Sequence, residues 1–394
     1  MSGPDTSFEL RRLRRGAALT LVFAGVLAAG AAGGAFGGDR APGERAAAPV
    51  GSSPAAHNQD VQDVNEAAAE ALADGKSAAE AARREVSRSG DRWGAVYSPH
   101  EYEEFAQSLD GEYTGVGLRA RRGDDGGIEV SRVQKGGPAD RAGIRRGDRL
   151  LSIDGKRVED RPVTEVVALL RGDAEQARAG SPVELGLSRE GRDWRQTVRR
   201  AVLRTSPVTV ERPHPEGPVR IKVDSFTKGA GERVREAVLS APEGAGVLLD
   251  LRGNSGGLVV EATRAASAFL DGGLVATYDV DGSQRALHAE PGGDTRRPVV
   301  ALVDGGTMSA AELLTGALQD RGRAVVVGER TFGKGSVQMP SELPDGSVAE
   351  LTVGHYRTPA GHRLDNRGIT PDLEVGEKAA QRAESVLSGL GGPS

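Results

Sequence analysis

Apolar residues in the second half of the chain recur with two alternating periods. Short continuous apolar runs, typical of buried strands, are separated by stretches whose apolar residues lie three or four positions apart, as in helices. The predicted strands are 219–223, 246–251, 274–280, 299–303 and 324–327, and the predicted helices are 229–239, 258–270 and 309–319. Val337 and the run 348–353 predict a closing β-hairpin. This alternation predicts an α/β core with parallel strands, whose functional loops follow the C-terminal ends of strands.

A basic and then apolar segment begins the chain. Four arginines within residues 11–15 precede an Ala- and Gly-rich apolar run that extends to about residue 35. This order predicts a secretory signal peptide or an uncleaved signal anchor over residues 1–36, with the rest of the chain exported. The alternative is a buried Ala-rich helix. We expect an extracytoplasmic protein, either membrane-anchored through this segment or secreted.

Two further segments precede the first strand-rich region. Residues 37–59 are rich in Gly, Pro, Ala and Ser, which predicts a flexible linker. Residues 60–111 carry Ala and Leu side chains at helical spacing, and Pro99 is placed to begin a short helix through Leu109. We therefore expect an N-terminal helical segment over 60–111, forming a cap or a contact between copies of a homo-oligomer.

Residues 112–202 contain strands separated by dense turn signals. Residues 136–155 read Gly-Gly-Pro-Ala-x-x-Ala-Gly-Ile-x-x-Gly-Asp-x-Leu-Leu-x-Ile-Asp-Gly, and a helix is predicted from Pro162 to Gly172. This region resembles a PDZ domain. The resemblance implies that a loop donates backbone N–H groups to the C-terminal carboxylate of a peptide, which adds as a strand beside the helix. That loop would consist of Gly115, Val116, Gly117 and Leu118. The alternative for the loop is an ordinary turn in a β-barrel.

Composition and charge argue against several classes of function. The 394 residues carry a net charge of −5, which does not suggest a nucleic-acid partner. No cysteine is present, so disulfides, thiol catalysis and cysteine metal sites are excluded. The six histidines lack the spacing of a zinc motif such as His-Glu-x-x-His. We expect neither a metal nor another cofactor.

Three local patterns compete as the reactive site. Ser255, within Gly253–Gly257, mimics the nucleophile segment of chymotrypsin-like proteases, but it lies in an α/β stretch without cysteines. Residues 328–335 approach a phosphate-binding loop but have Gly where Ser or Thr should follow the lysine. Ser309 with Glu312 matches a capping box, so that this serine could act only as a helix cap.

Several stretches together resemble the carboxy-terminal processing proteases, the tail-specific serine peptidases of the S41 family. They are 247–257, Ser309-Ala-Ala-Glu312, Gln319-Asp320, 327–338 with its Thr-Phe-Gly-Lys-Gly-Ser-Val-Gln run, and Gly368–Asp372. The resemblance covers about residues 60–376. It implies an α/β (α+β) multidomain fold: a crotonase- or ClpP-like peptidase core over 203–376, an inserted PDZ β-barrel, and a C-terminal tail over 377–394.

The same resemblance implies the catalytic roles. Ser309 would be the nucleophile, Lys334 the general base 25 residues later (334 − 309 = 25), and Gln338 the residue that orients the lysine. A lysine with an ordinary pKa near 10.4 is protonated at neutral pH, whereas burial favours the neutral amine. We therefore expect Lys334 to be enclosed and to have no carboxylate partner.

Cleavage also requires donors for the oxyanion of the tetrahedral intermediate. The expected donors are the backbone N–H of Ala310 at the helix start and one in the Gly256–Gly257 pair, which could instead form only a strand-to-helix turn. The family often has Pro before this pair, where this chain has Ser255.

These residues together predict an exported serine endopeptidase that acts on proteins with accessible C-terminal tails. Two other classes compete with it. An adaptor with a PDZ domain on an inactive peptidase fold would lack Ser309 or Lys334. An acyl-CoA enzyme of crotonase type would not explain the PDZ-like region.

Overall fold

The computed structural model describes residues 20–21, 54–123, 126–159, 161–172, 178–213, 217–280 and 283–390. The chain divides into two compact units, Met1–Val96 with Val208–Ser394, and Tyr97–Pro207. We call them the α/β unit and the small β unit. The predicted signal segment 1–36 lies outside the described residues, apart from the two-residue strand β1 (Thr20–Leu21). No helix of the described ranges is long and apolar enough to cross a bilayer.

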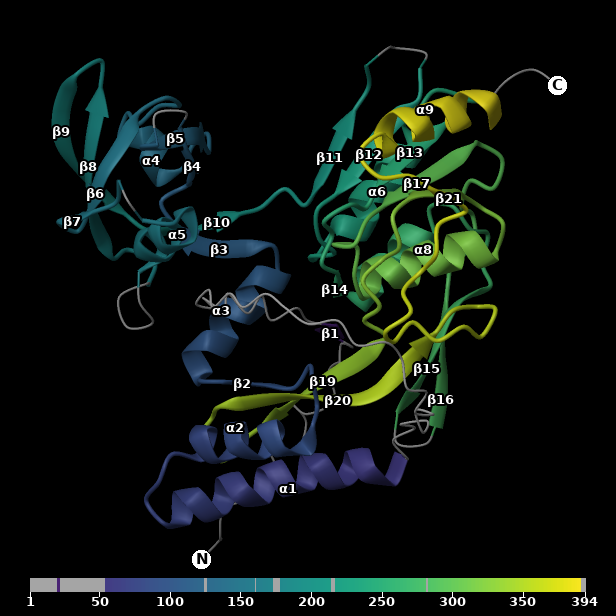
Figure 1. Ribbon diagram of the computed structural model, residues 1–394, viewed down its shortest axis with the longest axis horizontal. Coiled ribbons are helices and arrows are strands. Elements are labelled where there is room, and N and C mark those ends of the chain that lie inside the picture. The colour runs from purple at the N-terminus through teal and green to yellow at the C-terminus, as the bar shows by residue number, and fades with distance from the viewer. Residues whose placement is uncertain are drawn as a thin grey trace, which may run out of the picture. The chain divides into compact units, whose positions relative to one another are not determined.

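The α/β unit contains a six-stranded sheet in the order β11-β12-β13-β17-β18-β21 (Figure 1). Its strands are β11 (Val208–Glu211), β12 (Val219–Val223), β13 (Val247–Asp250), β17 (Val299–Val303), β18 (Val325–Gly328) and β21 (Leu373–Glu374). All neighbouring pairs are parallel except β11 with β12. The predicted parallel α/β core is confirmed.

Both faces of this sheet are buried, which explains the continuous apolar runs in the sequence. On one face Leu249 and Ala301 pack with α6 (Ala230–Leu239), α7 (Val259–Ala266) and α8 (Ala310–Asp320). On the other face Leu248 and Leu302 pack against α9 (Ala379–Leu390), drawn in yellow in Figure 1. Helix α9 lies in the region expected to be a tail, and its buried Ala379, Ala383 and Leu387 recur at four-residue spacing.

A second sheet of the α/β unit is antiparallel, in the order β16-β15-β20-β19. Its strands are β15 (Leu274–Val280), β16 (Ser283–His288), β19 (Ser336–Glu342) and β20 (Val348–Arg357). The predicted hairpin is therefore present as β19 and β20, with Gln338 opposite Thr352.

The N-terminal helices pack on this hairpin. They are α1 (Pro54–Ala73), which begins inside the expected linker, and α2 (Ala78–Ser89). Val64, Ala82 and Val86 form a core with Leu343 and Leu351. The following strand, β2 (Ala95–Tyr97), pairs with β20.

The small β unit begins with α3 (Pro99–Leu109), whose Ser98 and Glu101 form a complete capping box. Its main sheet has the order β4-β5-β6-β8-β9, with β7 paired to β6, and a separate ribbon joins β3 to β10. The strands are β3 (Glu112–Gly115), β4 (Leu118–Arg122), β5 (Ile128–Val133), β6 (Arg149–Ile153), β7 (Lys156–Arg157), β8 (Pro182–Arg189), β9 (Arg192–Arg199) and β10 (Ala201–Arg204). The helices are the short α4 (Pro138–Arg141) and α5 (Val163–Arg171). Strand β4 is an edge strand of this sheet.

Candidate active site

Ser309 occupies a strained position directly before α8. Its backbone has φ 56° and ψ −118°, a region that residues other than glycine rarely adopt and that costs about 1–3 kcal/mol. The side chain is buried, and its Oγ has no hydrogen-bond partner among the described residues. A sharp, strained turn between a strand and a helix, with an uncommitted hydroxyl, is the geometry used to present a nucleophilic serine.

Glu312 joins the serine segment to the lysine segment. Its Oε2 accepts hydrogen bonds from the backbone N–H groups of Ser309 at 2.8 Å and Lys334 at 2.9 Å. Its Oε1 accepts from the Thr331 hydroxyl at 2.6 Å and the Gly333 N–H at 2.7 Å. Burial raises the pKa of Glu312, and these four donors oppose that rise because they bind the ionised form. The two motifs that the sequence places 25 residues apart therefore meet at one buried carboxylate.

Lys334 is enclosed, as expected from the sequence. Its side chain is 2% exposed, and Nζ donates to Gln338 Oε1 at 2.8 Å. Burial lowers the pKa of Lys334 to about 8. Two carboxylates, Glu350 and Asp91, favour the ammonium and limit this fall. Burial raises the pKa of Glu350 itself to about 7. We expected no carboxylate partner for Lys334, whereas the charges of two carboxylates act on its amine.

Trp93 completes the enclosure of the lysine. Its ring centroid lies 4.8 Å from Lys334 Nζ and 5.8 Å from the Phe332 ring. Its backbone carbonyl accepts a hydrogen bond from Gln338 Nε2. Sequence reasoning missed this residue, because Trp93 lies in a turn without a motif and is more than 200 positions from Phe332, Lys334 and Gln338.

The Gly256–Gly257 pair lies beside Ser309. A Cβ on Gly256 would lie 3.1 Å from Ser309 Cβ, and one on Gly257 would lie 2.5 Å from the carbonyl oxygen of Phe226. Both glycines have positive φ, 102° and 131°. Glycine is therefore required at these positions by the backbone and by the close approach of neighbouring segments.

The expected oxyanion donors differ in their present hydrogen bonds. The Gly256 N–H donates to Asn254 Oδ1 at 2.8 Å, so this group is already engaged. The Ala310 N–H, at the first turn of α8, has no acceptor among the described residues. Ala310 is therefore better placed to donate to a substrate than Gly256.

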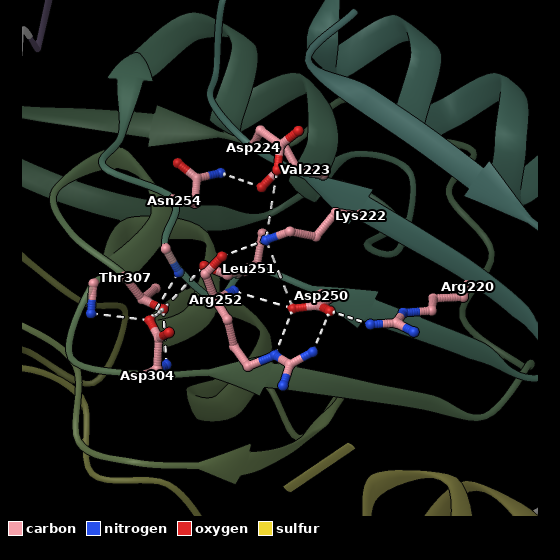
Figure 2. Close-up of polar contacts among 12 residues, drawn as sticks. Arg220, Lys222, Val223, Asp224, Asp250, Leu251, Arg252, Asn254, Asp304 and Thr307 are labelled. Atoms are coloured by element: carbon pink, nitrogen blue, oxygen red, sulfur yellow. Dashed lines mark hydrogen bonds and ion pairs between the residues drawn. The ribbon is translucent and has the colours of Figure 1, made fainter. Parts of the chain in front are cut away.

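A charged cluster holds the loop that contains these glycines (Figure 2). Asp250, at the end of β13, accepts from Arg252 at 2.7 and 2.9 Å and from Arg220 at 2.7 Å. Lys222 Nζ lies 3.8 Å from Asp250 and donates to the Arg252 carbonyl. These cations lower the pKa of Asp250 to about 2 against the opposing effect of burial. Arg252 therefore supports the loop through its ion pair with Asp250.

A second carboxylate links the two loops that follow β13 and β17 (Figure 2). Asp304 Oδ1 accepts from the N–H groups of Gly253 at 2.8 Å and Gly306 at 2.9 Å. The Thr307 hydroxyl donates to the Leu251 carbonyl at 3.0 Å. Both loops lie at the C-terminal ends of adjacent parallel strands, where the strand pattern predicted functional loops.

In the small β unit, the predicted carboxylate loop connects β3 to β4. The carbonyls of Val116 and Gly117 accept from the N–H groups of Ala139 at 2.9 Å and Gln134 at 2.8 Å. Val116 is buried in the core, and Gly117 has φ 78°. Leu118 begins the edge strand β4. The carbonyl side of the loop is thus fixed by neighbouring backbone.

The two other sequence patterns that were considered as reactive sites are the segment around Ser255 and the phosphate-loop-like segment. Ser255 is half-buried in the loop between β13 and β14 (Gly257–Leu258). The phosphate-loop-like segment 328–335 leads into strand β19, whereas a phosphate-binding loop leads into a helix. Within the described residues, no three His, Cys, Asp or Glu side chains are arranged to hold a metal ion.

Comparison with known proteins identifies both parts of the chain. Residues 219–375 match peptidase family S41, and residues 129–179 match the PDZ domain. A chloroplastic carboxyl-terminal-processing peptidase 3 of Arabidopsis thaliana is 35% identical over 308 residues, covering 73% of this chain and 58% of that protein. A carboxyl-terminal-processing protease of Synechocystis is 35% identical over 296 residues, covering 73% of this chain and 68% of that protein.

Among solved structures, the photosystem II D1 C-terminal processing protease has a TM-score of 0.48 and 29% identity, over 76% of this chain and 81% of that one. The chain spans less than two thirds of the Arabidopsis relative. The family and domain matches confirm the two resemblances seen in the sequence and the mixed α/β fold class with a PDZ domain.

Proposed function

The chain belongs to peptidase family S41, and from this premise we propose that it is an exported serine endopeptidase that cleaves proteins near their C-terminal tails. Ser309, Lys334 and Gln338 would carry out the reaction through an acyl-enzyme. Carboxyl-terminal-processing relatives at 35% identity support this reaction class. The export assignment rests on the basic and apolar pattern of residues 1–36. Secretion and anchoring through that segment are both compatible with it.

In the first half of the reaction, the neutral amine of Lys334 takes the proton of Ser309 as Oγ attacks the substrate carbonyl carbon. The tetrahedral intermediate collapses when Lys334 gives that proton to the leaving amine, and the acyl group stays on Ser309. Water then attacks the ester, again with Lys334 as the base. The buried, unpartnered Oγ and the lowered pKa of the lysine support this cycle.

Two backbone groups would stabilise the oxyanion. The Ala310 N–H lies at the N-terminus of α8, where the helix dipole also favours negative charge. The second donor would come from the Gly256–Gly257 pair. We favour Gly257 because the Gly256 N–H is bound to Asn254.

The PDZ domain would bind the substrate tail. The carboxylate would lie at the N–H groups of Gly115, Val116, Gly117 and Leu118, and the preceding residues would extend edge strand β4 beside α5. The free edge of β4 in its sheet supports this placement. An adaptor without activity would not require the buried lysine and strained serine.

One observation carries the proposal: a lysine only 2% exposed, hydrogen-bonded to a neutral amide and joined to Ser309 through Glu312. The test uses an unstructured protein with an apolar C-terminus, prepared with a free carboxylate and as its amide, and identifies products by mass. We expect an internal cut and a lower kcat/KM for the amide. Failure to cut either form would overturn the peptidase assignment, whereas equal cutting would overturn only tail recognition.

A further inference from the structure

The turn that follows α2 is anchored on the β19–β20 hairpin. Asp91 Oδ1 accepts from the Thr352 hydroxyl at 2.8 Å and from the Trp93 N–H at 3.0 Å. Asp91 Oδ2 accepts from the Thr352 N–H at 2.7 Å. On the other side, a Cβ on Gly94 would lie only 2.7 Å from Val86 in α2. The backbone of Trp93 is therefore fixed by a strand and a helix, and not by local sequence alone.

The Trp93 carbonyl decides which way the Gln338 amide faces. A carbonyl can only accept a hydrogen bond, so the amide group that reaches it must be Nε2. The amide oxygen is then turned toward Lys334 Nζ, which donates to it at 2.8 Å. Gln338 and Thr352 are directly opposite on β19 and β20, so the carbonyl and the Asp91 anchor act at one cross-strand pair.

The indole ring of Trp93 covers the same amine. Its centroid is 4.8 Å from Lys334 Nζ, and the Phe332 ring meets it edge-on. Exclusion of water by the rings favours the neutral amine, whereas the face of the indole favours the ammonium. Burial is the largest influence on the pKa of Lys334, which it lowers to about 8.

We propose that Trp93 is a positioning residue for Lys334, acting through its carbonyl on the Gln338 amide and through its indole on access of water to the amine. The N-terminal helical segment would thus complete the active site of the core. The catalytic meaning of this role rests on the proposed function, because it requires Lys334 to be the base.

The four charged groups around the amine come from three segments: β20, α8 and the turn that follows α2. Glu350 on β20 and Asp91 in the turn favour the ammonium. Glu312 on α8 binds the backbone N–H of Lys334. The Arg92 guanidinium lies 4.8 Å from the same indole centroid. All four groups are therefore kept in every Trp93 variant, so that a change in the pKa of Lys334 can be assigned to Trp93.

A spectroscopic test needs no catalytic activity. The chain has two tryptophans, so Trp194→Phe leaves Trp93 as the single indole emitter. We expect its emission to change with pH, with a midpoint near 8, as the adjacent lysine loses its proton. The change should disappear in Trp194→Phe with Lys334→Met. Absence of a transition between pH 6 and 10, or its survival after loss of the lysine, would overturn the proposal.

A kinetic test compares Trp93→Ala and Trp93→Phe, with Trp194→Ala as the matched control in the other unit. In Trp93→Ala, water can reach the lysine amine and favours its charged form. The midpoint of the pH profile of kcat/KM should therefore rise by about one pH unit, and kcat/KM at pH 7 should fall about tenfold. Trp93→Phe keeps a ring and the carbonyl and should stay within about threefold of wild type, as should the control.

If folded Trp93→Ala has the same midpoint in its pH profile of kcat/KM as wild type, the positioning role of Trp93 is contradicted. If that variant does not fold, Trp93→Leu is used, for which we expect a smaller upward shift, and no shift would contradict the role. If the wild type does not cut any substrate, the proposed function fails, while the emission test still decides whether Trp93 covers the lysine amine.

Discussion

Glu312 accepts the backbone N–H of Lys334 at 2.9 Å, although the two residues lie on different segments of the α/β unit. The same oxygen accepts the N–H of Ser309 at 2.8 Å. A glutamate that the sequence assigns to a helix cap therefore fixes the distance between the proposed nucleophile and base. Ser309 and Glu312 are arranged as in a capping box, but Ser309 Oγ makes no hydrogen bond among the described residues.

Replacement of Glu312 by Gln should damage both stability and activity. The amide would place N–H donors opposite two of the four groups that now donate to the carboxylate, and buried unmatched donors cost about 1–3 kcal/mol each. We expect a lower midpoint of thermal unfolding and a fall in kcat of about 100-fold or more. Glu342→Gln, an exposed change on β19, is the control and should have neither effect. A fully active Glu312→Gln enzyme would contradict the role of this carboxylate.

The rate should depend on pH through Lys334. The base must be neutral, and its pKa is lowered by burial to about 8. The value of kcat/KM should therefore rise about tenfold per pH unit below pH 8 and level off above it. A profile that is flat between pH 6 and 9 would exclude this lysine as the base.

Replacement of Gln338 by Glu should move that profile to higher pH. A carboxylate beside Nζ favours the ammonium, which raises a neighbouring pKa by about 1–3 units and lowers activity at pH 7 correspondingly. Activity should return at more alkaline pH. Gln338→Ala removes the orientation without adding charge, so its activity should fall without an equal shift in the profile. The comparison is made from full pH–rate curves of both variants.

Asp250 should stabilise the fold in a pH-dependent way. Its folded pKa of about 2 lies below the ordinary value of 3.8, so its contribution is complete above about pH 4 and is lost as pH falls through 2. The shift corresponds to about 2 kcal/mol at pH 7. Asp250→Asn should lose about that much in urea unfolding at pH 7, and less at pH 3. Asp224→Asn, an exposed carboxylate 3.8 Å from Lys222, is the control and should change stability little.

Much of the α/β unit could be predicted because its apolar pattern is local. Strands 219–223, 274–280 and 299–303 coincide with β12, β15 and β17. Helix α9 was missed although its apolar residues carry a helical spacing, because the short terminal segment offered no further signal.

The candidate site was only partly predictable. Ser309, Lys334 and Gln338 were predicted because their spacing belongs to a family motif. The contacts of Glu312 with Thr331 and Gly333 and of Trp93 with Gln338 depend on tertiary structure. Two of these three contacts involve backbone groups, which carry no sequence signal.

Single substitutions of the proposed dyad test the central claim most directly. Initial rates on an unstructured protein with an apolar C-terminus are compared for wild type, Ser309→Ala, Lys334→Ala and Lys334→Arg, with Ser255→Ala as the control serine. We predict losses of about 1,000-fold or more for the first three variants, including Lys334→Arg because arginine stays protonated, and near-wild-type rates for Ser255→Ala. Wild-type cutting by folded Ser309→Ala, Lys334→Ala or Lys334→Arg would contradict the account.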